Sequence, residues 1–418
     1  MKTFLIILLV VLVIFMLVSC SGNKQDKGEQ TEGTTDIIEK NEETLEEVDE
    51  KSPIVPINVD DYYKAVLFSL PDEPFRDAIV SHMRKQSSLE WICSENFGVS
   101  EKWANWGIDL TFVKGQKYTG IPYADTKVSY IQFEEALVNG TYTCESMAWK
   151  DVFGVQCVSS IMNSIQQFDP SVYGLSDNLT PGVKNFRGKI CGDYNVPENV
   201  RKSNQIITAN TPEDMYKAYT QLKKGDIVIT KDFDKGTSHL RVVVEEPNVV
   251  KTGAGKINPY KSSIKCIEQT NCFDKTRTDG VKTTWYVDHI YTFDKLYSTD
   301  YVPVTLEIYD KDITECELPY ILLDNEITEE QIQCGVLSST VKSNFPIRYV
   351  YLDVYNKSGE LVKRSMAYDM ASKFTVNLRN YSMPIIENLE NGEYTFVATA
   401  GIAIDSAELA RVDFTYKK

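Results

Sequence analysis

The sequence predicts an α+β domain followed by an all-β sandwich, preceded by an apolar segment and an acidic tether. Three observations predict this order. A hydrophobic run opens the chain, helical patterns precede strand patterns up to about residue 303, and short alternating strands follow from Val304. The chain has 418 residues, 42% of them hydrophobic, which is enough for two domains with cores. The predicted domains are residues 59–303 and 304–418.

The first twenty residues predict export. Lys2 precedes a continuous apolar run from Phe4 to Val18, as in a signal peptide or an uncleaved anchor. The run ends in LVSC, Leu17–Cys20, which resembles the bacterial lipobox. That resemblance implies a lipoprotein signal peptide over residues 1–20, with the lipid attached to Cys20. It places the protein outside the cytoplasm, anchored to the bacterial cytoplasmic membrane. A transmembrane anchor is the alternative and implies the same location.

Residues 21–58 predict a disordered tether. Residues 21–55 contain eleven acidic residues, four lysines and no aromatic residue. Such a segment buries too little apolar surface to offset its chain entropy. The net charge of the whole chain, −16, argues against a nucleic-acid partner.

Helical patterns dominate the first part of the α+β domain. Residues 59–106 predict helix, with core candidates Phe75, Ile79, Met83 and Leu89–Ile92 and a structural or solvated His82. FGVQCVSSIMNSIQQF, Phe153–Phe168, carries a helical apolar stripe: Val158, Ile161, Met162, Ile165 and Phe168. Its polar residues, Ser159, Ser160, Asn163 and Ser164, are expected on the opposite face. A short helix is predicted after Thr211 as N-cap, with Pro212 at its first position.

Strand patterns follow. KKGDIVIT, SHLRVVVEE and SSIKCIEQ, within residues 223–269, predict a meander of antiparallel strands, and residues 283–303 close the domain. TGAGKINP, Thr252–Pro259, lacks the P-loop spacing and predicts a hairpin or loop. Beyond Val304, alternating strands separated by turns such as NKSG and ENGE predict an immunoglobulin-like sandwich. No residue there has a catalytic pattern, and a wall or protein ligand for this domain stays open.

Cys157 lies at the start of a predicted helix, where the helix dipole favours a thiolate. A buried inert thiol and half of a disulfide are the alternatives. The chain has nine cysteines, and Cys316 with Cys334 and Cys266 with Cys272 are candidate disulfides whose connectivity the sequence leaves open. The absence of a CxxC pair and the presence of only three histidines argue against a structural zinc site, and no cofactor is expected.

His239 is the candidate partner of that thiol. It opens a predicted strand after the polar loop KDFDKGTS, so it can face a cleft. The next strand is expected to run antiparallel, which brings its end, Glu268 or Gln269, close to His239 as an orienting group. His289, between apolar strand residues, is predicted to be structural.

These residues, in this order, resemble the NlpC-type cell-wall peptidases, which are papain-like cysteine peptidases. The pattern consists of G-x-PY, a glycine before a helix-start cysteine, GD-x-V, a strand-opening histidine and a polar third residue. Its matches within residues 59–303 are Gly120–Tyr123, Gly154 with Cys157, Gly225–Val228, His239, and Glu268 or Gln269. For the polar third residue, the resemblance slightly favours Gln269 over Glu268.

The resemblance implies a papain-like domain in which Cys157 attacks a peptide carbonyl and His239 transfers the proton. It also implies that Tyr123 lies beside the nucleophile and helps to bind substrate, the stem peptides of peptidoglycan. The chain departs from the family at Gln156, at Val158–Ser159 and at Arg241, where the family commonly has aspartate, Ser-Gly and a small residue. The alternative function is a catalytically inactive surface lipoprotein that binds a cell-wall or protein partner.

Overall fold

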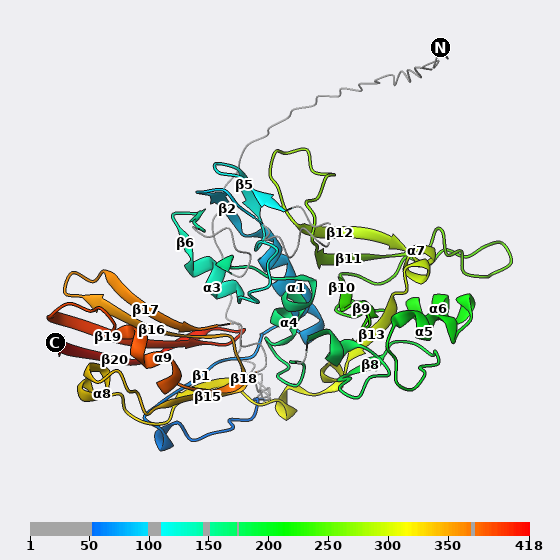
Figure 1. Ribbon diagram of the computed structural model, residues 1–418. Coiled ribbons are helices and arrows are strands. Elements are labelled where there is room, and N and C mark those ends of the chain that lie inside the picture. Colours follow the sequence, from blue (N-terminus) through cyan, green and yellow to red (C-terminus); the bar gives the residue numbers. More distant parts are fainter. Residues whose placement is uncertain (1–51, 99–109, 145–150, 174, 369–372) are drawn as a thin grey trace, which may run out of the picture. The chain divides into compact units, whose positions relative to one another are not determined.

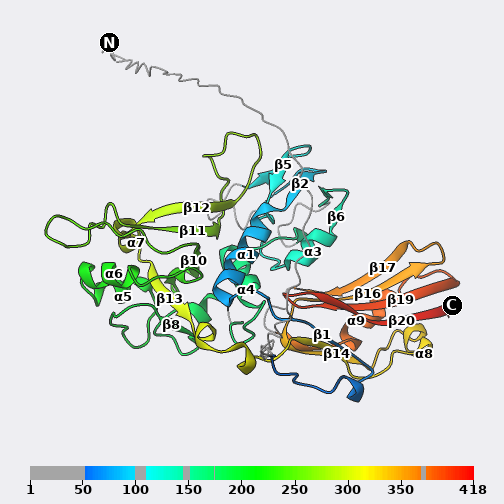
Figure 2. The same ribbon diagram turned by 180° about the vertical axis from the view of Figure 1, so that it is seen from behind.

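The computed structural model describes residues 52–98, 110–144, 151–173, 175–368 and 373–418 (Figures 1 and 2). Helices and sheets are both present, so the α+β class is confirmed. The signal segment, Cys20 and the tether up to residue 51 lie outside the described residues. Among the helices in the described ranges, none has the length and apolar character needed to cross a membrane.

A six-stranded antiparallel sheet forms the centre of the α+β part. The strand order is β12-β11-β10-β9-β13-β8. The strands are β8 (Gly188–Ile190), β9 (Ile227–Asp232), β10 (Thr237–Val243), β11 (Ser263–Gln269), β12 (Trp285–Thr292) and β13 (Val302–Leu306). The predicted meander of strands after residue 223 is confirmed as β9, β10 and β11, and the Lys251–Ile257 bridge makes the Thr252–Pro259 segment a hairpin.

Helices α1 (Phe75–Ser88) and α4 (Cys157–Ile165) pack on each other and on this sheet. The predicted apolar stripe of α4 is buried, as expected. The polar side of α4 is buried too, whereas the sequence pattern placed it on an outward face. Hydrogen bonds make this burial tolerable: Asn163 Nδ2 donates to Val128 O at 2.7 Å, and Ser164 Oγ donates to Ser160 O at 3.0 Å.

Within residues 59–98, the described part of the region predicted as helix over residues 59–106, an α-helix forms only over α1, and residues 99–106 lie outside the described residues. Leu89–Ile92 belong largely to strand β2, and Ile92 is 46% exposed. Residues 90–93 form a strand because they include an aromatic and a β-branched residue, which favour strands, and because successive side chains alternate between exposed and buried positions. Two small sheets contain β2 (Glu90–Cys93), β3 (Phe97–Gly98), β4 (Thr111–Phe112), β5 (Lys117–Thr119), β6 (Leu137–Val138) and β7 (Thr141–Tyr142).

Short helices complete the α+β part: α3 (Tyr130–Glu135), α5 (Ser203–Thr208), α6 (Pro212–Tyr219) and α7 (Phe293–Ser298). The predicted start of α6 is confirmed. The Thr211 side chain accepts from the backbone N–H of Asp214, and Pro212 occupies the first turn.

The C-terminal part contains two four-stranded antiparallel sheets that contact each other. One is formed by β1 (Lys64–Leu67), β14 (Tyr320–Leu323), β15 (Thr340–Ile347) and β18 (Lys373–Asn377). The other is formed by β16 (Tyr349–Asn356), β17 (Leu361–Ala367), β19 (Gly392–Gly401) and β20 (Ser406–Tyr416), and α8 (Glu329–Gln333) and α9 (Arg379–Ser382) connect strands.

The two parts share strands across the predicted boundaries. Strand β13 spans residues 303 and 304, the predicted junction, and pairs with β9 and β8 of the central sheet. Strand β1 comes before the α+β part in sequence but pairs with β14 of the C-terminal part. Within the predicted tether, Ile54 is ordered against the C-terminal part, because its N–H donates to Cys316 O at 2.8 Å.

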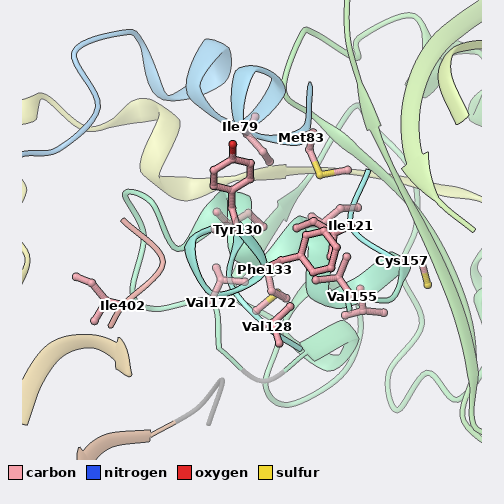
Figure 3. Close-up of a cluster of buried hydrophobic side chains, with 14 of the residues drawn as sticks. Ile79, Met83, Ile121, Val128, Tyr130, Phe133, Val155, Cys157, Val172 and Ile402 are labelled. Carbon is pink, nitrogen blue, oxygen red and sulfur yellow. The ribbon is translucent and has the colours of Figure 1, made fainter. Parts of the chain in front are cut away.

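Polar contacts and a common core also join the two parts. Gln132 Nε2 donates to the Tyr351 hydroxyl at 3.1 Å, and Arg348 donates to Gln166 Oε1 at 2.9 Å. Figure 3 shows Ile402, from the loop between β19 and β20, in the same cluster of buried side chains as Ile79 and Phe133. The described residues therefore form one packed unit rather than two separate ones.

Candidate active site

Cys157 is the first residue of α4, the helix buried between the sheet and the rest of the core. The thiol lies at the edge of the buried cluster (Figure 3) and is 4% exposed. Its Sγ is 3.6 Å from the carbonyl oxygen of Ser238, the residue before His239. Just before the helix, the Gln156 N–H donates to Ser159 Oγ at 2.7 Å, which fixes how the chain enters α4.

The Gly120–Tyr123 segment lies against the chain that leads into α4. The Val155 N–H donates to Pro122 O at 2.9 Å, and the Ala124 N–H donates to Val155 O at 3.1 Å. This approach requires Gly154, because a Cβ there would be 2.5 Å from Pro122 O. The G-x-PY segment and the glycine before the cysteine thus form one local structure.

A β-bridge between Tyr123 and Val155 brings Tyr123 close enough to Cys157 for the two groups to interact electrostatically. Burial, followed by the negative charge that Cys157 would carry, raises the pKa of the Tyr123 phenol well above its ordinary value. The hydroxyl therefore stays protonated at neutral pH and can act as a hydrogen-bond donor.

His239 lies on β10 between the thiol and a carboxylate. Its Nε2 contacts Glu268 Oε2, and the ring lies close enough to Cys157 to interact with it. Since Nε2 faces Glu268, Nδ1 is the nitrogen left to exchange a proton with the thiol. Burial alone would lower the pKa of His239, but the charges of Cys157 and Glu268 and the hydrogen bonds to them outweigh it and raise the pKa to about 10.

Glu268, not Gln269, is the residue that contacts His239. The Glu268 side chain is 1% exposed and accepts hydrogen bonds from His239, Arg241 and Tyr291. Burial favours the neutral acid, but the hydrogen bond to His239 and the nearby positive charges prevail and lower the pKa of Glu268 to about 2. Gln269 points the other way, and its Nε2 donates to the carbonyl oxygen of Ile121 at 2.9 Å.

Backbone register explains this division of roles. Neighbouring residues on β11 face opposite sides of the sheet, so Glu268 and Gln269 cannot both face His239. An irregularity in the β11–β12 pairing falls between Cys266 and Glu268. The β12 strand accommodates it with Asp288 in a left-handed conformation at φ 58°.

Arg241, Tyr291 and Tyr301 are site residues to which the sequence assigned no role. The Arg241 guanidinium carbon lies 3.8 Å and 4.0 Å from the ring centres of Tyr291 and Tyr301. The Tyr301 ring in turn meets the His239 ring edge to face, with 6.4 Å between centres. Arg241 could have been found from the sequence, because positions 239 and 241 of one strand share a face. The tyrosines depend on tertiary register.

The other candidate residues lie in structural positions. His82 Nδ1 is 2.9 Å from Ser164 Oγ, and burial lowers the pKa of His82 to about 3, so the ring is neutral. His289 packs on Tyr286, with 4.4 Å between ring centres. Asp226 of the GD turn is buried and pairs with Arg76 at 2.7 Å, which ties the start of β9 to α1.

The eight cysteines from Cys93 to Cys334 are all free thiols in the described part of the chain. Neither candidate pair, Cys316 with Cys334 or Cys266 with Cys272, is a disulfide there. In the same residues, no cluster of three or more His, Cys, Asp or Glu side chains is placed to hold a metal ion.

The arrangement has the parts that a cysteine nucleophile requires. A thiol stands at a helix N-terminus, an imidazole contacts it, and a buried carboxylate orients the imidazole. The first N–H groups of α4 have no acceptor within the helix, so they can stabilise an oxyanion formed beside Cys157.

Comparisons with known proteins add little to this geometry. No family model matches the chain, and no curated protein matches it. Among solved structures, dimeric latent PorU from Porphyromonas gingivalis is similar at 12% identity and a TM-score of 0.13. That similarity covers 45% of this chain and 23% of the PorU chain, and it carries no argument about fold or function.

Proposed function

We propose that the protein is an exported, lipid-anchored cysteine peptidase or amidase of the NlpC type that hydrolyses peptidoglycan stem peptides. The observation that carries the proposal is the contact of His239 with both Cys157 and Glu268. Export and anchoring through Cys20 rest on the apolar N-terminal segment and its LVSC ending.

In the proposed reaction, the Cys157 thiolate attacks the carbonyl carbon of the substrate and forms a C–S bond. The His239 imidazolium gives its proton to the amine as the C–N bond breaks. Water then attacks the thioester, His239 takes a proton from that water, and the free acid leaves as the C–S bond breaks and the Cys157 thiolate and His239 imidazolium are restored. Glu268 keeps the imidazole oriented and supports its positive charge, and Tyr123 contributes to substrate binding.

We also propose a papain-like arrangement for the α+β part and an immunoglobulin-like arrangement for the C-terminal part. The first is supported by α4 packing its cysteine end against β10 and β11 of an antiparallel sheet. The second is supported by two contacting four-stranded antiparallel sheets. A wall or protein ligand for the C-terminal part is part of the proposal, because attachment would keep the active site near its substrate.

Digestion of purified peptidoglycan, followed by mass spectrometry, tests the function. The wild-type protein and Cys334→Ser are expected to release peptide fragments, while Cys157→Ser releases none. Cys334 is a matched control because it is an exposed free thiol in the C-terminal part. Equal release by Cys157→Ser would exclude Cys157 as the nucleophile. No release by the wild type, with Cys157 labelled by iodoacetamide no faster than Cys334, would favour the binding lipoprotein.

A further inference from the structure

Arg241 lies on the same face of β10 as His239 and contacts the same carboxylate. Its Nε donates to Glu268 Oε2 at 2.9 Å, the oxygen that His239 also contacts. The other oxygen, Oε1, accepts from the Tyr291 hydroxyl. Both oxygens of Glu268 are therefore held, so the carboxylate cannot turn away from His239 without losing a donor.

The guanidinium is itself held in one orientation. It lies against the rings of Tyr291 and Tyr301, and the Arg241 side chain is 13% exposed. A planar cation between aromatic rings gains cation–π attraction and loses little freedom on making its hydrogen bond. The contact with Glu268 is therefore fixed in geometry, unlike a surface ion pair.

We infer that Arg241 is a positioning residue that keeps Glu268 ionised and aligned beside His239, and so maintains the reactive state of Cys157 in mild acid. The inference rests on the proposed function and extends it to a residue at which this chain departs from the NlpC pattern. The physical reason is the cost of a buried charge. A carboxylate that is 1% exposed favours protonation unless cations and hydrogen-bond donors compensate.

Few of the titratable and charged groups around Glu268 can make the reactivity of Cys157 depend on pH in mild acid. They are His239, Arg241, Tyr286, Tyr291, Tyr301, Cys157 and Cys266. Burial raises the pKa of Tyr286, Tyr291, Tyr301 and Cys266, so these four groups are neutral below pH 7. Arginine stays charged throughout. In mild acid, the charge on Glu268 therefore sets how strongly the His239 imidazolium supports the thiolate.

Alkylation of Cys157 by iodoacetamide, followed by peptide mass spectrometry, measures this state without any substrate when the pH range extends down to about 2, where Glu268 titrates, and up to about 8. The acid limb is the part of the pH profile in which the alkylation rate falls as the pH is lowered. In Arg241→Gln, this limb is expected to move to higher pH by about one unit, the scale of one lost charge-assisted hydrogen bond. Arg241→Lys keeps the charge but loses the planar contact, so its limb should lie between those of wild type and Arg241→Gln. Arg84→Gln removes an exposed arginine paired with Asp288 and should leave the limb unchanged.

The pair of variants at Glu268 decides whether Arg241 acts through that carboxylate. Glu268→Gln alone should move the limb upward, and adding Arg241→Gln to it should cause no further shift. An equal loss of rate at every pH in Arg241→Gln, or the same shift in the Glu268→Gln background, would overturn the inference. If Arg241→Gln does not fold, an unmoved limb in Arg241→Lys overturns it. Failure of the proposed function would differ, because it appears as absent peptide release while the limb still shifts.

Discussion

A Cβ added to Gly154 would lie 2.5 Å from the carbonyl oxygen of Pro122, so these two residues meet backbone to backbone. The same Cβ would be 2.6 Å from Ala124 Cβ, and neither neighbour is a flexible side chain that can give way. This contact fixes the distance between the strand-like segment carrying Tyr123 and the residues leading to Cys157.

Gly154→Ala is therefore expected to destabilise the fold and to reduce activity more than its small volume suggests. Overpacking of this kind typically costs about 1–3 kcal/mol. Each kcal/mol lowers the melting temperature by about 2–4 °C in a protein of about 150–250 residues, and by less in a longer chain such as this one. Gly253→Ala is the matched control, because a Cβ there meets nothing within 4 Å. Thermal unfolding of both variants checks the prediction, and equal melting temperatures would contradict the close contact.

The pairing of Glu268 with His239 predicts a defined pH dependence of stability. Glu268 has a pKa of about 2 in the folded protein and about 4.3 when unfolded. Its contribution is therefore present above pH 4.3 and is lost as the pH falls toward 2. His239 has a pKa of about 10 when folded and about 6.5 when unfolded. Its contribution is complete below pH 6.5 and is lost as the pH rises toward 10.

The difference in melting temperature between wild type and Glu268→Gln should consequently be largest between about pH 4.3 and 6.5 and should shrink on both sides. Glu95→Gln serves as the control, because Glu95 pairs with Lys114 at an exposed site, where an ion pair contributes little. Melting curves from about pH 3 to 10 test this. A difference that stays constant across that range would show that the carboxylate is not coupled to the imidazole.

The sequence predicts the residues of the site better than it predicts their roles. Helix starts and strand openings depend on local rules, so Cys157 on α4 and His239 on β10 could be placed from spacing alone. The choice between Glu268 and Gln269 could not be made in this way. It depends on which side of β11 faces β10, and on a buried carbonyl at Ile121 that accepts from both Gln269 and Trp285.

Burial of polar residues is the second feature that the sequence pattern misses. The serines and the asparagine of α4 look like a solvent-facing side, because periodicity measures hydrophobicity and not hydrogen-bond partners. In the structure some of those partners lie within α4 or just before it, and others come from residues far away in the chain. For example, Gln86 of α1 donates to both Ser160 O and Ser164 Oγ at 3.0 Å. A helix surrounded by protein can carry polar residues wherever such partners exist.

Cys20→Ala is expected to release the protein from membranes. The reason is the LVSC ending of the apolar run, which implies that a lipid on Cys20 attaches the protein to the membrane. Fractionation of cells that express each form measures this, with peptide release by the soluble form as the check that the folded part is unchanged. A variant that stays membrane-bound with its N-terminal segment intact would establish a transmembrane anchor instead.

The last prediction concerns the junction at residues 303 and 304. Ending the chain at Pro303 removes Val304, Thr305 and Leu306, which are the partners of all three residues of β8. It also removes β14, the partner of β1. Val304 and Leu306 are buried, and the loss of two such side chains costs about 3–6 kcal/mol. A whole domain has only about 5–15 kcal/mol of stability.

Three chains that begin at Ser52 and end at different residues separate the contribution of β13 to stability from that of the rest of the C-terminal part. The chain ending at Lys418 is expected to unfold in one cooperative transition, because its two parts share strands and a core. The chain ending at Asp310 keeps β13 and the hydrogen bonds of Thr305 with Asp226 and Arg76, but it loses β14 and the contacts of Gln132 and Gln166. It should therefore melt at a lower temperature. The chain ending at Pro303 should not fold. If that shortest chain melts at the same temperature as the longest one and hydrolyses a soluble stem peptide, the C-terminal part is an independent module and the shared strands do not contribute to stability.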